Sequence, residues 1–485
     1  MKKVFLFAAF VSVYSVARSQ EKNVHISIEA QGIETTNGTV PFWLRSNQFG
    51  SIPLSGTSGS IIGSIRKDYD TTKTFGWGAS FQGRGNAGKT SQFILIEGFV
   101  KAHAGIIELK AGRSKDIVGL VDSTLSSGSF PISGNALGIP KVSISIPNYY
   151  SIPVFGKLFA IKGTLASGYL GNIEVKSYEK PTNFKAYYMQ NDLYVRIGKP
   201  SWRFKFQAGY NHEAMWGDEN RVFGNFFNLS GPETYWYVLL GKTYRGGSKV
   251  GNHLGSVDLG AEYKFDALTV FLYRQNFYDI GALSSLANIA DGLNGIRITN
   301  NQPRNGNFHW NKFLFEVLYT ANQAGVLGSK TTNSGAENYY NNYEYQEGWS
   351  YKDLGLGTPF ITTINYARSN LGSSEKQFFI NNRVLALHAA AQVSLFNWLY
   401  TGKLSYSQNQ GTFETGTESF LSISGRVKRP ANYGAFKKVN EYSAYLGAVR
   451  PLKNGYSIGY DIGYDHGGLL YDSFGIILKV SKSFL

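Results

Sequence analysis

The stretch YSIGYDIGYD, residues 456–465, decides the fold of this chain. Its even-numbered positions hold tyrosine or isoleucine, and its odd-numbered positions hold serine, glycine or aspartate. Successive side chains on a β-strand point to opposite faces, so the stretch predicts a strand with one apolar face and one small or charged face. WRFKFQAGYN (residues 202–211) and VDLGAEYKF (residues 257–265) repeat the pattern. Alternation therefore runs through the chain.

The apolar faces separate a membrane barrel from a soluble β-sandwich, whose strands alternate in the same way. They are rich in aromatic residues, as expected where a transmembrane barrel meets the membrane interface. The chain also ends in an alternating stretch, residues 474–484, in which Phe484 is next to last. Lys482 interrupts its apolar face where a long side chain can snorkel to the interface. Because lipid forbids an open sheet edge, we predict an all-β fold, a closed transmembrane antiparallel outer-membrane β-barrel.

Other alternating stretches predict further strands, well over a dozen in all, although alternation does not fix their number. They are residues 75–83, 93–104, 108–113, 158–166, 194–199, 268–275, 312–319, 399–407, 420–427 and 442–449.

The beginning of the chain reads as a secretory signal peptide. Lys2 and Lys3 precede an apolar run, and small residues at positions 17 and 19 form a cleavage site. We place cleavage after Ser19, so residues 1–19 are the signal peptide and residues 20–485 a single barrel domain. The expected location is the outer membrane of a Gram-negative cell.

The composition agrees with an exported barrel. The chain has 56 glycines, 73 Phe, Tyr and Trp residues (33, 32 and 8) and 17% charged residues, and it has no cysteine, which excludes disulfides and thiolate metal sites. After the signal, no apolar run reaches the ~18 residues of a transmembrane helix. The formal net charge is +15, which suits anionic lipid head groups or acidic polysaccharide. An exported protein is not expected to meet nucleic acid.

The stretch GRGNAGKT, residues 83–90, matches both the P-loop and the dinucleotide-binding pattern. Both patterns need a strand before them and a helix after them, because the helix N-terminus faces the phosphate. Alternating residues flank this stretch on both sides, so we predict strand, glycine-containing connection, strand. A hairpin between neighbouring strands explains the glycines without a nucleotide.

The spacing of the seven histidines does not support a zinc-binding site. None forms an H-x-x-x-H or H-x-H pair, and Trp216 stands where the motif that begins at His212 and Glu213 needs its second histidine. A Ser/His/carboxylate site assembled across strands remains open at this stage. We expect no metal site, no cofactor and no enzyme.

Five stretches resemble the Wzi-like capsule assembly family of bacterial outer membranes, in particular its Bacteroidota-type members. They are VPFWLRSNQFGSIP (40–53), residues 111–144, ADGLNGI (290–296), residues 337–360 and NNRVLALH (381–388), which together span most of the mature chain. The resemblance implies an outer-membrane barrel of about eighteen strands, with a lumen partly plugged by loops and short helices. It also implies a lectin that holds surface or capsular polysaccharide and supports capsule assembly. Further expectations are a monomer, contact with outer-membrane lipid and lipopolysaccharide, and insertion by the barrel assembly machinery.

Residues 112–141 are too polar for a lipid-facing strand and can bend into the lumen. Polar and charged side chains in such a segment hold it against the wall, although direct sugar contact is an alternative. The structural lumen or plug candidates, including two arginines from later segments, are Arg113, Asp122, Ser126, Asn135, Arg274 and Arg383.

Residues 337–360 interleave aromatic rings with amides and carboxylates. Rings pack on the C–H faces of sugars while polar groups bond hydroxyls, but a folded loop has the same composition. A second long insert, residues 211–253, carries tryptophans and a short predicted helix that opens near Ser230 or Pro232. The polysaccharide-binding candidates are Tyr339, Tyr340, Asn341, Gln346, Trp349, Trp216 and Trp236. We expect Ala at Trp349 or Tyr340 to weaken polysaccharide retention but not barrel insertion.

Three functions are compatible with this sequence. Polysaccharide binding rests mainly on the family resemblance. An outer-membrane porin or diffusion channel is the alternative, and it would keep an open lumen. An outer-membrane hydrolase or acyltransferase is the third, and it would need His and Ser or Asp to converge.

Overall fold

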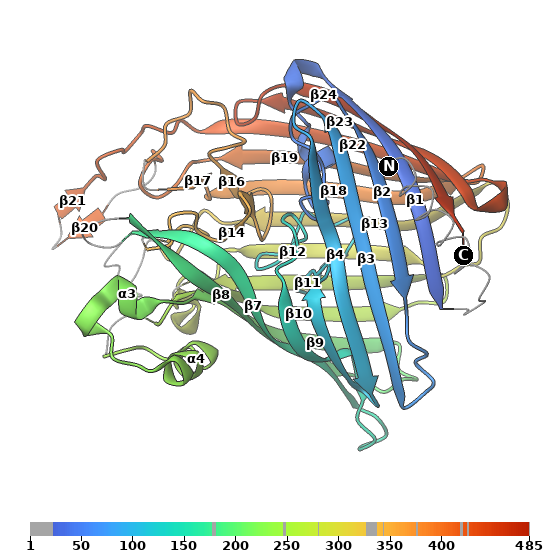
Figure 1. Ribbon diagram of the computed structural model, residues 1–485, viewed down its shortest axis with the longest axis horizontal. Coiled ribbons are helices and arrows are strands. Elements are labelled where there is room, and N and C mark those ends of the chain that lie inside the picture. The colour runs from blue at the N-terminus through green and yellow to red at the C-terminus, as the bar shows by residue number, and fades with distance from the viewer. Residues whose placement is uncertain are drawn as a thin grey trace, which may run out of the picture.

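The computed structural model describes residues 23–484, apart from residues 177–180, 246–248, 280, 326–336, 343, 375–376, 418–420 and 424–425. It is a closed antiparallel barrel of eighteen strands, in which β1 pairs with both β2 and β24 (Figure 1). The predicted fold is thereby confirmed, whereas the predicted signal peptide lies outside the described residues. The wall strands are β1 (Val24–Thr35), β2 (Ser58–Lys67), β3 (Phe75–Gly88), β4 (Gln92–Ala104), β5 (Ile107–Arg113), β6 (Lys141–Ser151), β7 (Phe159–Lys176), β8 (Pro181–Ile197), β9 (Phe204–Trp216), β10 (Asn252–Lys264), β11 (Leu268–Tyr278), β12 (Gly292–Asn300), β13 (Phe308–Tyr319), β18 (Val384–Leu395), β19 (Trp398–Asn409), β22 (Val439–Pro451), β23 (Tyr456–Gly467) and β24 (Ser473–Ser483).

The apolar faces of the wall strands point outward and the polar faces point into the lumen. In the stretch that predicted the fold, now β23, Tyr456 and Tyr464 are both 48% exposed, whereas Asp461 and Asp465 are buried. Leu478 on the neighbouring β24 is exposed, and Ile477 is buried in the lumen. An apolar exterior of this kind faces lipid in a transmembrane barrel. None of the described helices is both long and apolar enough to cross a membrane.

The two ends of the barrel differ in the length of their connections. The first and last strands meet where the backbone N–H of Phe484 donates to the carbonyl oxygen of Ile26 at 2.9 Å. This end, on the right in Figure 1, carries short connections. In outer-membrane barrels the short turns are periplasmic and the long loops extracellular. The long connections at the opposite, outer end are residues 36–57, 114–140, 217–251, 279–291, 320–383 and 410–438.

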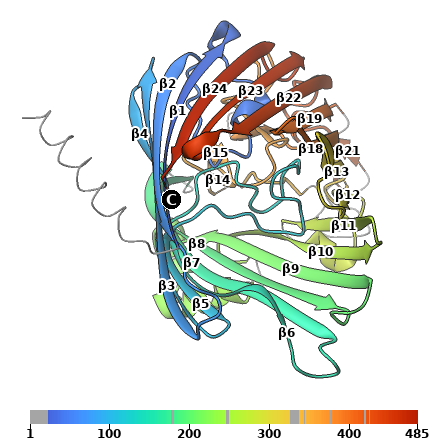
Figure 2. The ribbon, with the colours of Figure 1, turned by 90° about the vertical axis from the view of Figure 1, so that its right-hand side faces the viewer.

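Three of the long connections fold back into the lumen and form what we call the plug, which consists of residues 36–57, 114–140 and 337–381. Figure 2 shows β14 and β15 from the third of these segments inside the ring of strands. Phe130, Tyr340 and Trp349 are among its buried residues, and they share one apolar core with wall residues. The plug contains α2 (Phe42–Arg45), β14 (Ser350–Tyr351), β15 (Leu354–Gly355), β16 (Thr362–Thr363) and β17 (Phe379–Asn381).

A fourth connection stays outside the wall in its described part, residues 217–245 and 249–251, and we call this part the collar. It contains α3 (Glu219–Phe223) and α4 (Gly231–Leu239), which lie beside β7 and β8 in Figure 1. Helix α4 begins as predicted: Ser230 and Glu233 form a capping box, and proline follows in the first turn. The side chain of Glu233 accepts the backbone N–H of Ser230 at 2.9 Å.

The predicted hairpin is confirmed, but its connection is shorter than residues 83–90, because β3 runs to Gly88 and β4 starts at Gln92, which places the three glycines in the strand. The wall strand predicted at residues 420–427 is wrong. In its described part, β20 (Leu421–Ile423) and β21 (Arg426–Lys428) pair with each other in a separate sheet. A hairpin outside the wall has the same period of two, so alternation cannot exclude it. Strands β1, β2, β6, β12 and β18 were not predicted, since glycine, serine and alanine weaken their alternation.

Candidate functional site

The candidate site is the plugged lumen with its outer mouth. Its deep layer is residues 114–140, in which Asp122 contacts charged residues of β12 and β13. Lys312 on β13 donates to both carboxylate oxygens of Asp122 at 2.8 Å, and Arg297 on β12 lies 3.6 Å away. Burial alone would raise the pKa of Asp122, but the hydrogen bond and charge of Lys312, with the backbone N–H groups of Leu125 and Thr124, hold this pKa at about 2. The ion pair therefore fixes the deep layer to the wall.

Glu316 on β13 is a second anchor of the deep layer. Its carboxylate accepts the hydroxyl of Ser126 at 2.7 Å and the backbone N–H of Ser127 at 2.6 Å. The hydroxyl of Tyr273 on β11 also donates to it. On β10, Asp258 similarly accepts the backbone N–H of Leu120 at 3.0 Å. Carboxylates of the wall thus satisfy backbone donors of the plug, which a buried loop needs.

The outer layer, residues 337–381, holds most of the residues predicted to bind sugar, and it buries them. Tyr339, Tyr340 and Trp349 are at most 1% exposed. Trp349 donates its indole N–H to the carbonyl oxygen of Pro131 at 2.8 Å. The hydroxyl of Tyr340 donates to the carbonyl oxygen of Phe130. A sugar cannot stack on these rings unless the plug moves. Both tyrosines and the tryptophan instead join the outer layer to the deep layer.

The remaining candidates of this stretch are less deeply placed. Asn341 uses its amide to accept the backbone N–H of Phe379 at 3.0 Å and to donate to the carbonyl oxygen of the same residue at 2.8 Å. Gln346 is half-buried. Of the seven predicted sugar contacts, Trp236 is the most exposed, at 56%, and it lies on the collar. Trp216, the last residue of β9, is half-buried.

Asp291, the last residue of the connection before β12, contacts the outer layer of the plug. It accepts the hydroxyl of Tyr339 at 2.7 Å and the backbone N–H groups of Asn322 and Gln323 at 2.9 and 2.7 Å. Burial raises the pKa of Asp291 to about 6, although these donors favour the charged form. Asp291 is therefore a titratable contact between the wall and the plug.

Three of the predicted plug residues join segments near the outer end of the lumen. Arg113 donates to the carbonyl oxygen of Leu95 at 2.8 Å and to the hydroxyl of Tyr351 at 2.9 Å. Asn135 donates to the carbonyl oxygen of Gly355 at 3.0 Å. Arg383 donates to the carbonyl oxygen of Ala321 at 2.7 Å.

Arg274 does not lie in the lumen. It shares the outward face of β11 with the exposed Leu272, and it donates to Asn294 at 2.7 Å and to the carbonyl oxygen of Asp291 at 3.1 Å. The sequence placed it inside because a charged side chain on a lipid-facing position is unexpected. Near the outer rim, however, the connection before β12 supplies carbonyl partners.

The mouth contains a cluster that the sequence analysis missed, formed by residues 366–370 and the connection between β23 and β24. Arg368 donates to the carbonyl oxygen of Leu470 and to Asp472, both at 2.7 Å. Its guanidinium lies 5.5 Å from the ring of Tyr471, which is 42% exposed, and the hydroxyl of Tyr471 donates to Ser369 at 3.0 Å. The backbone N–H of Gly467, with the charge of Arg368, lowers the pKa of Asp472, so Asp472 is ionised at neutral pH. No motif signals this cluster, because its two segments are about 100 residues apart.

Two polar cavities lie between plug and wall, with volumes of about 270 and 200 Å³. The first is lined by Trp43, Asp122, Lys403 and Tyr445 among others, and the second by Lys110, Asp116, Lys141 and Lys162 among others. Lys141 lies 2.8 Å from Asp116. Burial opposes ionisation of Asp116, but Lys141 and Lys110 keep its pKa far below the usual range. Ion pairs across the second cavity therefore attach the plug to β5 and β6.

One Ser/His pair converges in the lumen. Nδ1 of His388 lies 2.8 Å from the hydroxyl of Ser405, and its Nε2 lies 2.7 Å from the carbonyl oxygen of Leu125. A backbone carbonyl thus stands where a triad has a carboxylate, and the indole N–H of Trp43 donates to Ser405 at 3.0 Å. Both side chains are buried, so the pair holds the plug in place. Among the described residues, no group of three or more His, Asp or Glu could hold a metal ion.

The sequence also contains a G-x-S-x-G pattern at residues 455–459. A nucleophile elbow needs a sharp turn from a strand into a helix. Ser457 instead lies within β23, and its hydroxyl meets that of Ser481 on β24 at 2.5 Å. The pattern is part of the wall.

Comparison with known proteins places the chain among outer-membrane barrels. No protein-family model matches the sequence, and no curated protein does. The fold is similar to that of Wzi of Escherichia coli, an outer-membrane protein involved in group 1 capsule assembly and described as a carbohydrate-binding β-barrel. The two chains are 11% identical, the TM-score is 0.53, and the match covers 94% of this chain and 83% of that chain. OccAB2 and OccAB4 of Acinetobacter baumannii are 11% and 10% identical, with TM-scores of 0.45, and cover 95% and 96% of this chain and 98% and 99% of their own. At these identities the likeness to Wzi is one of fold.

Proposed function

We propose that this chain is an outer-membrane protein that binds surface polysaccharide at its outer mouth and holds it at the cell exterior in support of capsule assembly. The observation that carries the proposal is the anchored plug. A diffusion channel needs an open lumen, whereas here Glu316, Lys312 and His388 of the wall each hold the deep layer in place. The solved barrel Wzi, described as carbohydrate-binding, has a similar fold.

The cluster around Tyr471 is the part of the mouth best suited to a sugar. An exposed aromatic ring can pack on the C–H face of a sugar, and the ionised Asp472 and the hydroxyl of Ser369 beside it can bond hydroxyl groups. The bonds of Arg368 to the β23–β24 connection keep this arrangement rigid, so little conformational freedom is lost on binding. Gln346, a half-buried residue of the plug, is a second contact candidate.

The test is binding of the purified full-length protein to an array of acidic and neutral bacterial polysaccharides, combined with conductance in planar bilayers. We expect polysaccharide binding, about tenfold weaker in Tyr471→Ala, and no steady conductance. Phe155→Ala, an exposed ring at the termini end, is the matched control and should bind like the unmodified protein. Steady conductance without polysaccharide binding would overturn the proposal and identify a channel.

A further inference from the structure

The collar packs on the outside of the barrel, next to the lipid-facing surface. Phe227 and Val238 of the collar form a cluster with Met189 and Ala214, whose side chains point outward from β8 and β9. Leu193, further along the outward face of β8, is 54% exposed. The collar therefore ends where the apolar exterior begins.

Hydrogen bonds fix the collar to the wall at this boundary. The amide of Asn191 on β8 donates to the carbonyl oxygen of Leu239 at the end of α4, at 3.3 Å. On β10, Nε2 of His253 donates to the carbonyl oxygen of Val250 at 2.7 Å, and its Nδ1 meets Nε2 of His212 on β9 at 3.0 Å. Because the end of α4 and the C-terminal end of the collar are held in this way, the collar is a built part of the rim.

The free side of the collar is apolar and aromatic. Phe226, Trp236 and Leu240 are 78%, 56% and 59% exposed. The ring of Trp216 lies 5.1 Å from that of Tyr187 and 6.0 Å from that of Tyr235. Large apolar groups in water are unfavourable, and Trp and Tyr concentrate at the boundary between lipid and water.

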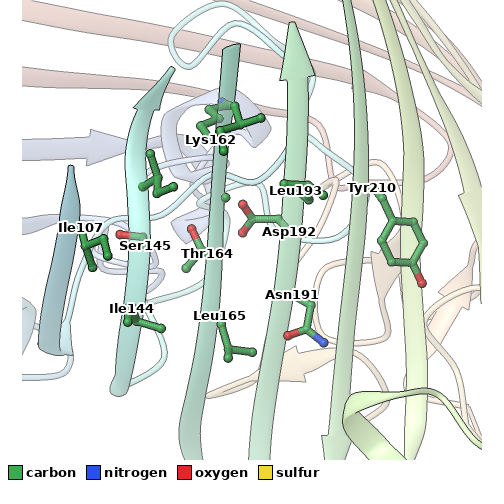
Figure 3. A pocket seen from close by; sticks show the side chains of 13 residues that line it. Ile107, Ile144, Ser145, Lys162, Thr164, Leu165, Asn191, Asp192, Leu193 and Tyr210 are labelled. Carbon is green, nitrogen blue, oxygen red and sulfur yellow. The ribbon is translucent and has the colours of Figure 1, made fainter. Parts of the chain in front are cut away.

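Next to the collar, on the side toward the short connections, the outer wall is hollowed, as Figure 3 shows for strands β5 to β9. The hollow has a volume of about 420 Å³ and includes Asn191, which holds the collar. Its outward lining consists of Ile107, Ile144, Leu165, Leu193 and Tyr210. Gly163 also lines the hollow and adds no side chain to it.

Two cations follow α4 on the collar. Nζ of Lys242 lies 5.7 Å from the ring of Tyr237, and the guanidinium of Arg245 lies 5.3 Å from the ring of Tyr244. Both side chains are exposed. A cation beside aromatic rings, above an apolar surface, has the chemistry that binds the phosphate of a lipid head group.

We propose that the collar binds a phosphorylated lipid of the outer leaflet, with the apolar side chains Phe226, Trp236 and Leu240 immersed at the membrane interface. Lys242 and Arg245 bind the phosphate, and an acyl chain lies in the hollow between Leu165 and Leu193. The collar belongs to the end of the barrel with long connections, which faces the outer leaflet. This site is separate from the polysaccharide site at the mouth.

The test measures binding of diphosphorylated lipid A to the full-length protein in detergent micelles by native mass spectrometry. We expect tight binding, about tenfold weaker in Lys242→Ala/Arg245→Ala and for lipid A without its phosphates. The control variant Lys89→Ala/Lys352→Ala removes two exposed lysines of the same rim and should bind normally. Equal binding by all variants, or equal binding of the dephosphorylated lipid, would overturn the proposal.

The position of Trp236 is tested in liposomes by fluorescence quenching. We expect lipids with a shallow doxyl group to quench the unmodified protein more than Trp236→Phe, and iodide in the water to quench both alike. Quenching of Trp236 by iodide but not by doxyl lipid would place the collar in water and overturn the proposal. Loss of polysaccharide binding, rather than lipid binding, in Lys242→Ala/Arg245→Ala would do the same.

Discussion

The hydroxyl of Ser126 donates to the carboxylate of Glu316 at 2.7 Å, which joins the plug to the wall across 190 residues of sequence. The same carboxylate accepts the backbone N–H of Ser127 and the hydroxyl of Tyr273. A single wall residue thus satisfies three donors, two of them in the plug. The plug is consequently part of the folded core of the barrel.

Glu316→Ala should loosen the plug, because it leaves these buried donors without an acceptor. Each lost hydrogen bond to a charged group costs about 1.5–3 kcal/mol. We expect a lower unfolding temperature and the appearance of ion conductance in planar bilayers. Glu262→Ala, at a lumen-facing position of β10 nearer the termini, is the control and should show no ion conductance. Silence in both variants would contradict the anchoring role of Glu316.

Lys312→Met should destabilise the deep layer by about 3–5 kcal/mol, since it leaves the Asp122 carboxylate buried without its main partner. Asp122→Asn/Lys312→Met should recover much of that loss, because the buried carboxylate that Lys312→Met leaves without its main partner is then removed. The measurement is denaturant unfolding in micelles, analysed as a double-mutant cycle. Additive losses would show that the pair does not act as a unit.

The pKa of Asp122 gives this contact a pH dependence. Its folded pKa of about 2 lies below the usual 3.8, so the contact stabilises the plug fully above pH 3.8 and loses that stabilisation as pH falls toward 2. Hydrogen exchange of residues 120–127 at pH 2.5 and 5, corrected for intrinsic rates, should show weaker protection at pH 2.5, where part of this stabilisation is lost. Equal protection at both would contradict the pKa.

Asp291 should act in the opposite sense. Its folded pKa of about 6 lies above 3.8, so stability is fully present below pH 3.8 and falls by up to about 3 kcal/mol as pH rises through 6. The backbone N–H groups of Asn322 and Gln323 should exchange more slowly at pH 4.5 than at pH 7.5 after correction. Asp291→Asn should abolish the difference. A difference that persists in this variant would implicate another group.

Trp349→Ala should destabilise the plug by about 3–5 kcal/mol, because its ring is wholly buried between the layers. Any loss of polysaccharide retention should therefore accompany plug loosening. Tyr340→Phe keeps the ring and removes a donor to Phe130, at a cost of about 1–3 kcal/mol. Conductance and polysaccharide retention measured together test this prediction. If Trp349→Ala loses polysaccharide retention while the plug stays in place and the bilayer shows no conductance, Trp349 would have to be a direct sugar contact.

The wall could be read from the sequence because its signal is local. Every second residue of β23 faces lipid, so the run of Tyr and Ile from Tyr456 to Tyr464 carries the prediction without any knowledge of the neighbouring strands. The polar character of residues 112–141 likewise showed that this segment cannot face lipid. The total of eighteen strands followed only from the family resemblance, because strands rich in glycine, serine and alanine lack contrast.

The roles of the aromatic loops were decided by the tertiary structure. Composition predicted Tyr340, Trp349 and Trp236 alike as polysaccharide contacts. In the structure Tyr340 and Trp349 are buried against Phe130 and Pro131, whereas Trp236 is exposed on the collar. Burial there depends on partners about 210 residues away, and no local pattern encodes that pairing. The cluster of Arg368 and Tyr471 escaped notice for the same reason. The sequence by itself determined a lipid-facing wall and identified segments that are too polar to belong to it. The closing of the barrel brings these distant segments into one lumen. Only this tertiary arrangement decided which of their side chains fill the core and which are exposed for binding.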